Sequence, residues 1–289
     1  MRLLPALLVA AVVACGDGGD TIVVGSKNFT EQRILGELLA QTLERAGFAV
    51  QRRFEMGGTF VCDAALRGGQ IDVYVEYTGT ALAAILKEDA AGEAASDVLA
   101  RVRERYAPAE LVWLEPLGFD NSFALVVRSD ARVSTISAAV LPARTWRAGV
   151  GYEFEQRADG LPALRRTYGL AFAAVRTMDL GLLYPALTGA EVDVIAGNVT
   201  DGLIDALDLK VLADDRRAFP PYEAVPVARA AMLERHPGAG RALRALGGRL
   251  DVATMRRLNH AVDGERRSPA GVVGEWLESA RLLDAEQSS

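Results

Sequence analysis

Histidine and cysteine are scarce in this sequence, whose 289 residues include two of each. A zinc site typically takes four nitrogen or sulfur ligands, and the few candidates here do not have that spacing. The sequence also lacks a Gly-x-Ser-x-Gly elbow and a glycine-rich phosphate loop. We therefore expect no metal, no cofactor and no catalytic residue.

Positive charge is also in short supply. Lys and Arg number 32 against 38 Asp and Glu, which gives a formal net charge of −6. Nucleic-acid surfaces depend on Lys and Arg that contact phosphates, so we expect no nucleic-acid partner. Half of the residues are hydrophobic and 24% are charged, which is typical of globular proteins. The length suits two domains of about 100–200 residues each.

The first apolar run, residues 3–13, is shorter than the roughly 20 residues of a membrane span. It leads into Cys15 and a Gly- and Asp-rich stretch, a pattern that resembles the lipobox of bacterial lipoproteins. We expect a lipoprotein signal peptide over residues 1–14 and a lipidated tether over 15–20. An ordinary signal peptide with an incidental cysteine is the alternative. With Cys15 acylated, Cys62 has no disulfide partner and is expected to be a buried small hydrophobe.

Strand and helix patterns alternate after residue 20. Short β-branched runs predict strands, and apolar residues at helical spacing predict helices between them. Helix 57–67 is expected to turn Phe60, Ala64 and Leu66 inward, and residues 88–110 are expected to form a solvent-facing helix. This order predicts a mostly parallel sheet flanked by helices. The expected elements of the first unit are strand 21–25, helix 30–46, strand 48–54, helix 57–67 and strand 71–75.

One segment of this unit recurs later in the chain. Residues 65–73 align with residues 186–194 without a gap, and both copies place Gly at a helix end and Asp in the following strand. We expect the two strands to end near Tyr77 and near residues 198–201. Ligands of open α/β sheets bind beyond the carboxyl ends of strands, so we expect these two strand ends to face each other across a cleft between two lobes.

The lobe boundaries follow from where the strand patterns stop and resume. We expect the first lobe to contain residues 21–119 and 226–289, and the second lobe residues 120–225. The chain then crosses between the lobes twice, which suits hinge closure around a ligand.

Several motifs, in the same order, resemble one family over about residues 21–285. They are residues 25–32, 71–80, 157–160, 200–204 and 219–222. The chain is similar to the glycine betaine/carnitine/choline-binding proteins, the quaternary ammonium compound family of ABC importer substrate-binding proteins. The resemblance implies an α/β fold of the two-lobed periplasmic binding protein class (type II-like), with a ligand cleft between lobes that are each a mostly parallel sheet flanked by helices.

The resemblance also implies a biological role. The protein would be an extracytoplasmic, membrane-anchored lipoprotein that binds glycine betaine, choline, carnitine or a related osmolyte. It would deliver this small-molecule ligand to an ABC permease that works with an ATPase.

A quaternary ammonium group cannot donate a hydrogen bond, and it is held by aromatic faces at roughly 0.5–2 kcal/mol per ring. A carboxylate on the ligand suits the fork of an arginine. The rings would come from Tyr77, Phe123 and Tyr222, and the fork from Arg157. The resemblance places these residues in or near the cleft: Lys27, Tyr77, Thr80, Asn121, Phe123, Arg157, Tyr184, Asn198, Thr200, Asp201 and Tyr222.

Simpler roles remain open for some of these residues. Tyr77 could cap the core, and Lys27 could form a salt bridge across the cleft. Thr200 and Asp201 could cap the next helix without contacting the ligand.

The sequence departs from the family pattern at two positions. Phe123 stands where the family often has Tyr, and Asn198 occupies a neighbourhood where the family often has an aromatic residue. Asn198 could hydrogen-bond a protonated amine, so an amino acid or another cationic amine is the alternative ligand.

Overall fold

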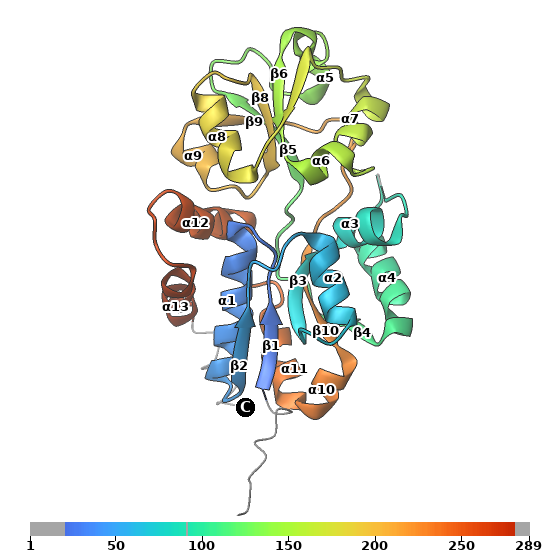
Figure 1. The fold of residues 1–289 in the computed structure, drawn as a ribbon, viewed down its shortest axis with the longest axis vertical. Coiled ribbons are helices and arrows are strands. Elements are labelled where there is room, and N and C mark those ends of the chain that lie inside the picture. The colour runs from blue at the N-terminus through green and yellow to red at the C-terminus, as the bar shows by residue number, and fades with distance from the viewer. Residues whose placement is uncertain (1–20, 91, 281–289) are drawn as a thin grey trace, which may run out of the picture.

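Two lobes, each built around a five-stranded sheet, make up the part of the chain that the computed structural model describes, residues 21–90 and 92–280 (Figure 1). The expected signal peptide, the tether and its lipidation site Cys15 lie outside the described residues. Among the helices of those residues, none combines the length and the hydropathy that crossing a membrane requires.

The first sheet gathers its strands from both ends of the described chain. Its order is β2-β1-β3-β10-β4, and β10 runs antiparallel to its neighbours β3 and β4. The strands are β1 (Thr21–Gly25), β2 (Ala49–Arg53), β3 (Val73–Tyr77), β4 (Leu111–Trp113) and β10 (Ala224–Arg229). The helices of this lobe are α1 (Thr30–Arg45), α2 (Thr59–Arg67), α3 (Thr78–Thr80), the π-helix η1 (Ala81–Leu86), α4 (Ala95–Tyr106), the 3-10 helix η2 (Ala107–Ala109), α10 (Ala230–Arg235), α11 (Pro237–Arg244), α12 (Val252–Asp263) and α13 (Pro269–Ser279).

The second sheet has the same arrangement of strands. Its order is β7-β6-β8-β5-β9, again with the fourth strand, β5, antiparallel to its neighbours. The strands are β5 (Phe123–Arg128), β6 (Arg147–Val150), β7 (Ala174–Thr177), β8 (Val194–Asn198) and β9 (Leu209–Leu212). The helices are α5 (Ile136–Ala139), the 3-10 helix η3 (Pro142–Thr145), α6 (Tyr152–Gln156), α7 (Leu161–Tyr168), α8 (Leu180–Thr188) and α9 (Leu203–Ala206). The predicted fold class, a two-lobed α/β binding protein, is confirmed.

The repeated segment, residues 65–73 and 186–194, makes the same backbone contact in each lobe. Asp72 precedes β3, and its carboxylate accepts a hydrogen bond of 2.9 Å from the backbone N–H of Val23 in the neighbouring strand. Asp193 precedes β8 and accepts one of 2.8 Å from the backbone N–H of Arg147. Each Asp therefore ties the start of one strand to the strand beside it.

Two helix predictions in the first lobe were wrong. In α2, Leu66 is buried as expected, but Phe60 is half exposed and Ala64 is also exposed. The expected burial of Cys62 is confirmed. The helix expected over residues 88–110 is α4 alone, and it buries one face that includes Val102. In α2 the buried face therefore differs from the one that the sequence suggested, and α4 buries an apolar face where a solvent-facing helix was expected.

The chain crosses between the lobes just before β5 and just before β10 (Figure 1). The two crossing segments are joined by a β-bridge between Asp120 and Glu223, and the Asp120 carboxylate also accepts a hydrogen bond from the N–H of Tyr222. Helix α12 makes a third connection, because the Asn259 amide of the first lobe donates to the carbonyl of Thr200 in the second, at 2.8 Å.

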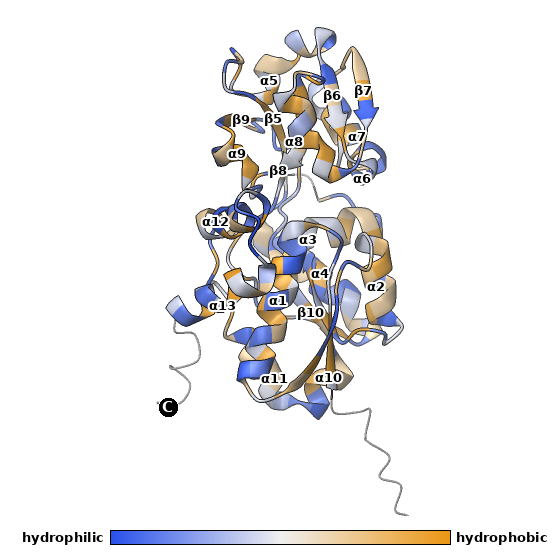
Figure 2. Ribbon diagram, turned by 60° about the vertical axis from the view of Figure 1, so that its left-hand side comes forward, coloured by the Kyte–Doolittle hydropathy of each residue, from blue (hydrophilic) through white to orange (hydrophobic). Residues whose placement is uncertain are grey.

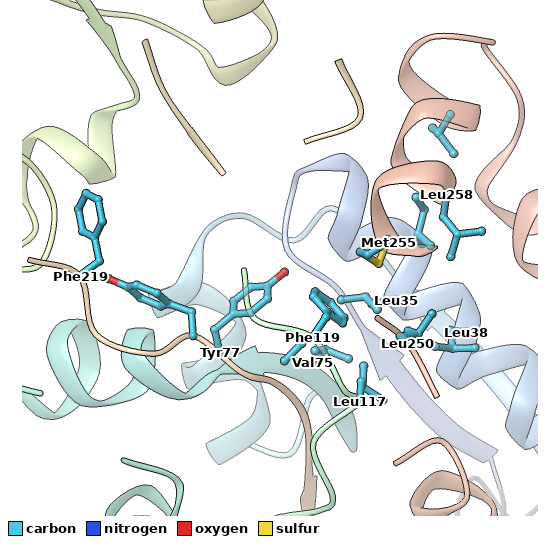
Figure 3. Packing of buried hydrophobic residues seen from close by; sticks show 14 of the residues in the cluster. Leu35, Leu38, Val75, Tyr77, Leu117, Phe119, Phe219, Leu250, Met255 and Leu258 are labelled. Atoms are coloured by element: carbon cyan, nitrogen blue, oxygen red, sulfur yellow. The ribbon is translucent and has the colours of Figure 1, made fainter. Parts of the chain in front are cut away.

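Apolar side chains form one continuous cluster across these connections. It contains Leu35 and Tyr77 of the first lobe, Phe219 of a crossing segment and Phe154 of the second lobe. Figure 3 shows Tyr77 between Phe219 on one side and Phe119 and Leu35 on the other. Strand β10, which follows the second crossing, is mainly hydrophobic (Figure 2). Near the crossing segments, the two lobes are thus packed against each other through apolar side chains.

Candidate functional site

Aromatic rings gather where β5 leaves the first crossing segment. The Phe123 ring is central: its centroid lies 4.9 Å from that of Phe154, 5.8 Å from that of Phe219 and 5.4 Å from that of Tyr222. All three pairs meet edge to face, the geometry that aromatic quadrupoles favour. The sequence predicted Phe123 and Tyr222 for the site, whereas Phe154 in α6 was missed.

Arg157 covers this aromatic group and is itself buried. Its guanidinium carbon lies 5.1 Å from the Phe123 ring centroid. Its Nε and Nη2 atoms donate to both oxygens of Asp159, at 2.9 and 2.5 Å, and the Tyr222 hydroxyl donates to the same carboxylate at 2.6 Å. Burial alone would lower the pKa of Arg157. The hydrogen bonds and the charge of Asp159 raise the pKa by more than burial lowers it, so the guanidinium stays charged.

The same arginine joins the two lobes. Nη2 of Arg157, in the second lobe, donates to the hydroxyl of Thr80 in the first lobe at 3.2 Å. Beside this contact, the Glu153 carboxylate of α6 lies so close to Gly58 that a Cβ atom on Gly58 would approach it to 2.2 Å. The residues predicted to face a ligand therefore contact one another, and the lobes must part, or these side chains must exchange partners, before a ligand enters.

Tyr77 ends β3 and is 5% exposed. Its hydroxyl donates to the Glu31 carboxylate at 2.6 Å, and the Asn121 amide donates to the same oxygen at 2.8 Å. The Thr200 hydroxyl of the second lobe donates to the amide oxygen of Asn121 at 2.6 Å. Tyr77, Asn121 and Thr200 are thus brought together as the sequence predicted, around a glutamate that the prediction did not include.

Lys27 lies beneath Tyr77 in the first lobe. Its ammonium group donates to Glu76 at 2.5 Å and to Thr59 at 2.9 Å, and it stands 5.1 Å from the Tyr77 ring centroid. Lys27 and Glu76 are both buried, and both belong to the same lobe. The alternative that Lys27 forms a salt bridge across the cleft is therefore wrong.

A separate group surrounds the end of β8. The Tyr184 hydroxyl and the backbone N–H of Asn198 both donate to one oxygen of Asp201, at 2.7 and 2.9 Å. Burial raises the pKa of Asp201 to about 6. Helix α9 begins after Gly202 without a side-chain cap, so the alternative that Thr200 or Asp201 caps this helix is wrong.

Asn198 nevertheless lies next to the aromatic group. It pairs directly with Phe123 in the antiparallel ladder of β5 and β8, so the two side chains stand on the same face of the sheet. Asn198 is partly exposed.

A cavity of about 410 Å³ opens beside the crossing segments. Phe123 and Phe219 line it, together with Asp120, Ser122 and Val199. Tyr77, Arg157 and Tyr222 do not line it, because they are packed into the contacts described above. In the described residues, no three His, Cys, Asp or Glu side chains are grouped so that they could hold a metal ion.

Two similar lobes around a buried aromatic and charged junction define the class of two-lobed solute-binding proteins. The family model described as the substrate binding domain of ABC-type glycine betaine transport systems matches residues 20–279. The chain belongs to this family of substrate-binding transport proteins, and it is not an enzyme.

Relatives of known name support the assignment. A glycine-betaine-binding protein of Pseudomonas aeruginosa is 35% identical over 99% of this chain and 97% of its own length. The carnitine transport binding protein OpuCC of Listeria monocytogenes is 31% identical over 94% of this chain and 90% of its own. A Helicobacter pylori protein, the ergothioneine transport permease/ergothioneine binding protein EgtU, is 33% identical over 90% of this chain but only 48% of its own length.

Solved structures share the whole fold. The crystal structure of a glycine betaine/carnitine/choline ABC transporter protein has a TM-score of 0.77 and 28% identity, and the match covers 90% of this chain and 99% of that one. Apo YehZ from Escherichia coli has a TM-score of 0.69 and 26% identity, with 91% and 99% of the two chains covered.

Proposed function

We propose that this protein is an extracytoplasmic solute-binding lipoprotein that captures a quaternary ammonium compound such as glycine betaine, choline or carnitine and delivers it to an ABC permease. The observation that carries the proposal is the junction of rings around Phe123, with Arg157 packed against it from the second lobe. Family membership supports the class of ligand and the transport role. The permease, with its ATPase, is the partner.

The binding mode follows from the charges at this junction. Tyr77, Phe123 and Tyr222 would offer their faces to the cationic end of the ligand once the lobes part. Arg157 would hold the carboxylate of a betaine, which must take the place that Asp159 now occupies or displace Glu153, whose carboxylate lies 3.6 Å from the Nη1 atom. When the lobes close over the ligand, they would exclude water from it, because the side chains on the two sides of the junction are already complementary to each other.

Titration calorimetry with glycine betaine, choline and carnitine tests the proposal, with arginine as the control ligand. We expect saturable binding of at least one quaternary compound and none of arginine. Small-angle scattering should show a smaller radius in the ligand-bound protein. Tight binding of arginine with no binding of any quaternary compound would overturn the proposal in favour of a cationic amine.

A second candidate, ergothioneine, is favoured by Asn198, which stands beside Phe123 where a further ring would complete an aromatic enclosure. An amide at this place can hydrogen-bond a polar group that glycine betaine lacks. The relative from Helicobacter pylori is a binding protein for ergothioneine, a larger betaine. Competition between ergothioneine and glycine betaine in the same calorimeter distinguishes the two candidates.

The lipid anchor is a separate part of the proposal and rests on the sequence around Cys15. Cys15→Ala should block acylation, and the protein should move from the membrane fraction to the soluble fraction of the cell envelope or remain unprocessed. A mutant that still fractionates with membranes like the wild type would disprove the anchor.

A further inference from the structure

The buried carboxylate of Glu31 has no role in the ligand chemistry described so far. It lies in the first turn of α1 and is 4% exposed. Three side chains donate to it: Tyr77 and Asn121 to one oxygen, at 2.6 and 2.8 Å, and Asn259 to the other at 3.1 Å. None of the ion pairs found within residues 21–90 and 92–280 includes Glu31. A buried carboxylate whose partners are all neutral is costly to keep ionised.

The three donors come from three parts of the molecule that meet at the junction. Tyr77 ends β3, Asn121 lies in the first crossing segment, and Asn259 belongs to α12. Asn121 and Asn259 are also both bound to Thr200 of the second lobe, at 2.6 and 2.8 Å. Glu31 therefore connects an expected ligand-binding ring, a hinge segment and, through one further bond, the opposite lobe.

We propose that Glu31 is a positioning residue of the ligand site, whose ionised carboxylate holds the Tyr77 ring and the first crossing segment in the arrangement that accepts the ligand. The proposal rests on the proposed function for the identity of the ligand. An ionised carboxylate accepts from all three donors, whereas a protonated one carries an O–H on one oxygen. The amide N–H groups of Asn121 and Asn259 cannot accept this O–H, and the Tyr77 hydroxyl can accept it only by turning its own O–H away from Glu31. Protonation therefore breaks at least one connection of the network.

The pKa of Glu31 lies near neutral pH. Burial raises its pKa to about 7, although hydrogen bonds from Tyr77 and Asn259 favour the charged form. Other titratable groups nearby are Lys27 at the Tyr77 ring, Asp201 in the second lobe, and His260 and Asp263 on α12. A ligand cation at the Tyr77 ring favours ionised Glu31, so binding should release a proton and affinity should rise with pH.

The stability of the protein should respond to pH with the opposite sign. The pKa of Glu31 is raised on folding from 4.5, so the folded protein takes up a proton at a pH where the unfolded chain does not. This contribution to the free energy of unfolding is complete below pH 4.5 and is lost as the pH rises through about 7. A rise in affinity together with a fall in stability over the same pH range would distinguish Glu31 from a residue with a structural role alone.

Calorimetry with choline from pH 6 to 8 tests the coupling, because choline has no proton that titrates there. Wild-type affinity should rise by up to about tenfold, the limit for release of one proton from a group of pKa about 7. Glu31→Gln should flatten this profile and also remove the matching pH dependence of the melting temperature. The control is Asp263→Asn, which removes another carboxyl at the same end of α1, one bound to Thr30, and should keep the slope. A flat wild-type profile, or the wild-type slope in Glu31→Gln, overturns the proposal.

Amide hydrogen exchange in the ligand-free protein tests the positioning role independently of the proposed function. Glu31→Ala should speed exchange in residues 119–122 and 198–201, and Glu31→Gln, which keeps an acceptor for Tyr77, should do so less. Unchanged exchange in Glu31→Ala overturns the positioning role even if every quaternary ligand binds. Should Glu31→Ala fail to fold, Glu31→Gln carries both measurements. If no quaternary compound binds the wild type but exchange responds as expected, the proposed function fails and the positioning role stands.

Discussion

The two lobes share a scaffold and differ in what they place at the equivalent strand end. Both use an Asp to tie the key strand to its neighbour, at Asp72 and Asp193. In the first lobe that strand ends at Tyr77, a buried ring, whereas in the second it ends at Asn198, a partly exposed amide. The difference shows that the repeated residues build the sheet, while the residues that end the two strands have diverged.

The lobes also differ in how they neutralise a buried cation. Lys27 of the first lobe pairs with Glu76 in the same lobe. Arg157 of the second lobe pairs with Asp159 but also reaches Thr80 across the junction. Both ion pairs lie within one lobe, but the hydrogen bond from Arg157 to Thr80 must break when the lobes part.

Loss of the second-lobe cation should have the largest effect on binding. We expect Arg157→Ala to weaken glycine betaine binding by about 2–4 kcal/mol, because a carboxylate loses its charged hydrogen bonds. Choline, which has no carboxylate, should lose much less, and calorimetry with both ligands makes the comparison. Equal losses would show that Arg157 holds the lobes together and does not read the ligand.

The second-largest effect is expected from Gly202→Ala, which adds a methyl group where the lobes meet. A Cβ there would approach the backbone nitrogen of His260, in α12 of the other lobe, to 2.2 Å. Because the atom that it meets belongs to the backbone, Gly202→Ala should cost about 1–3 kcal/mol in the free energy of unfolding. Gly181→Ala is the control, since a Cβ there meets nothing within 4 Å. Denaturant titration of both variants decides, and similar stability in the two would contradict the tight contact.

The ring at the first strand end should contribute less than Arg157 but to every ligand. Tyr77→Ala should cost about 1–2 kcal/mol for glycine betaine and choline alike, since it removes one aromatic face. Tyr77→Phe keeps the face and loses the hydroxyl bond to Glu31, so it separates the two roles. A loss confined to one of the ligands in the Tyr77→Ala protein would argue against a cation–π contact.

Adding an aromatic ring at the second strand end, in place of Asn198, should strengthen binding. Asn198→Tyr places a ring next to Phe123 on the same face of the sheet, and we expect a gain of about 0.5–1 kcal/mol for glycine betaine. If ergothioneine is the natural ligand, its affinity should fall in the same variant. Competition calorimetry measures both, and an unchanged ratio would show that Asn198 does not contact ligand.

The smallest effect is expected at the scaffold residue of the second lobe. Hydrogen bonds from Arg147 hold the pKa of Asp193 below its usual value. Its contribution to stability is therefore present above pH 4 and is lost as the pH falls through the lowered pKa. Asp193 is 22% exposed and its partner Arg147 is 39% exposed. Solvent therefore screens the pair, and Asp193→Asn should change the free energy of unfolding by less than about 1 kcal/mol at pH 7. Urea titrations at pH 7 and pH 3 should converge for mutant and wild type at the lower pH, and parallel curves would contradict this.

The sequence predicted the residues that adjoin recognisable strand ends, and it failed where the partner is distant. The family resemblance placed Tyr77, Asn121 and Thr200 in or near the cleft, and the structure brings them together around Glu31, while their contact with a ligand stays a prediction. Asn259 was missed because a single polar residue in α12 carries no local pattern, although it is bound to Glu31, 228 positions away. Periodicity shows that a helix has an apolar face, but not which partner that face meets.

Asp159 shows a second limit of the same kind. The family resemblance assigned the fork of Arg157 to a carboxylate on the ligand, yet the Asp159 carboxylate two residues away binds that fork. Which donor a charged group selects depends on the side chains that bury it, here including Tyr222 from the second crossing segment.

The position of β10 also sets an order of events as the chain folds. Every strand of the second sheet lies within residues 123–212, so that lobe is able to complete its sheet from one continuous stretch. In the first sheet β4 pairs only with β10, a strand more than a hundred residues later. We therefore expect the first lobe to complete its sheet after the second, once the chain has returned to place β10 between β3 and β4. Pairing over such long separations is slow, and the pairing of β10 is expected to be the last and slowest step in folding.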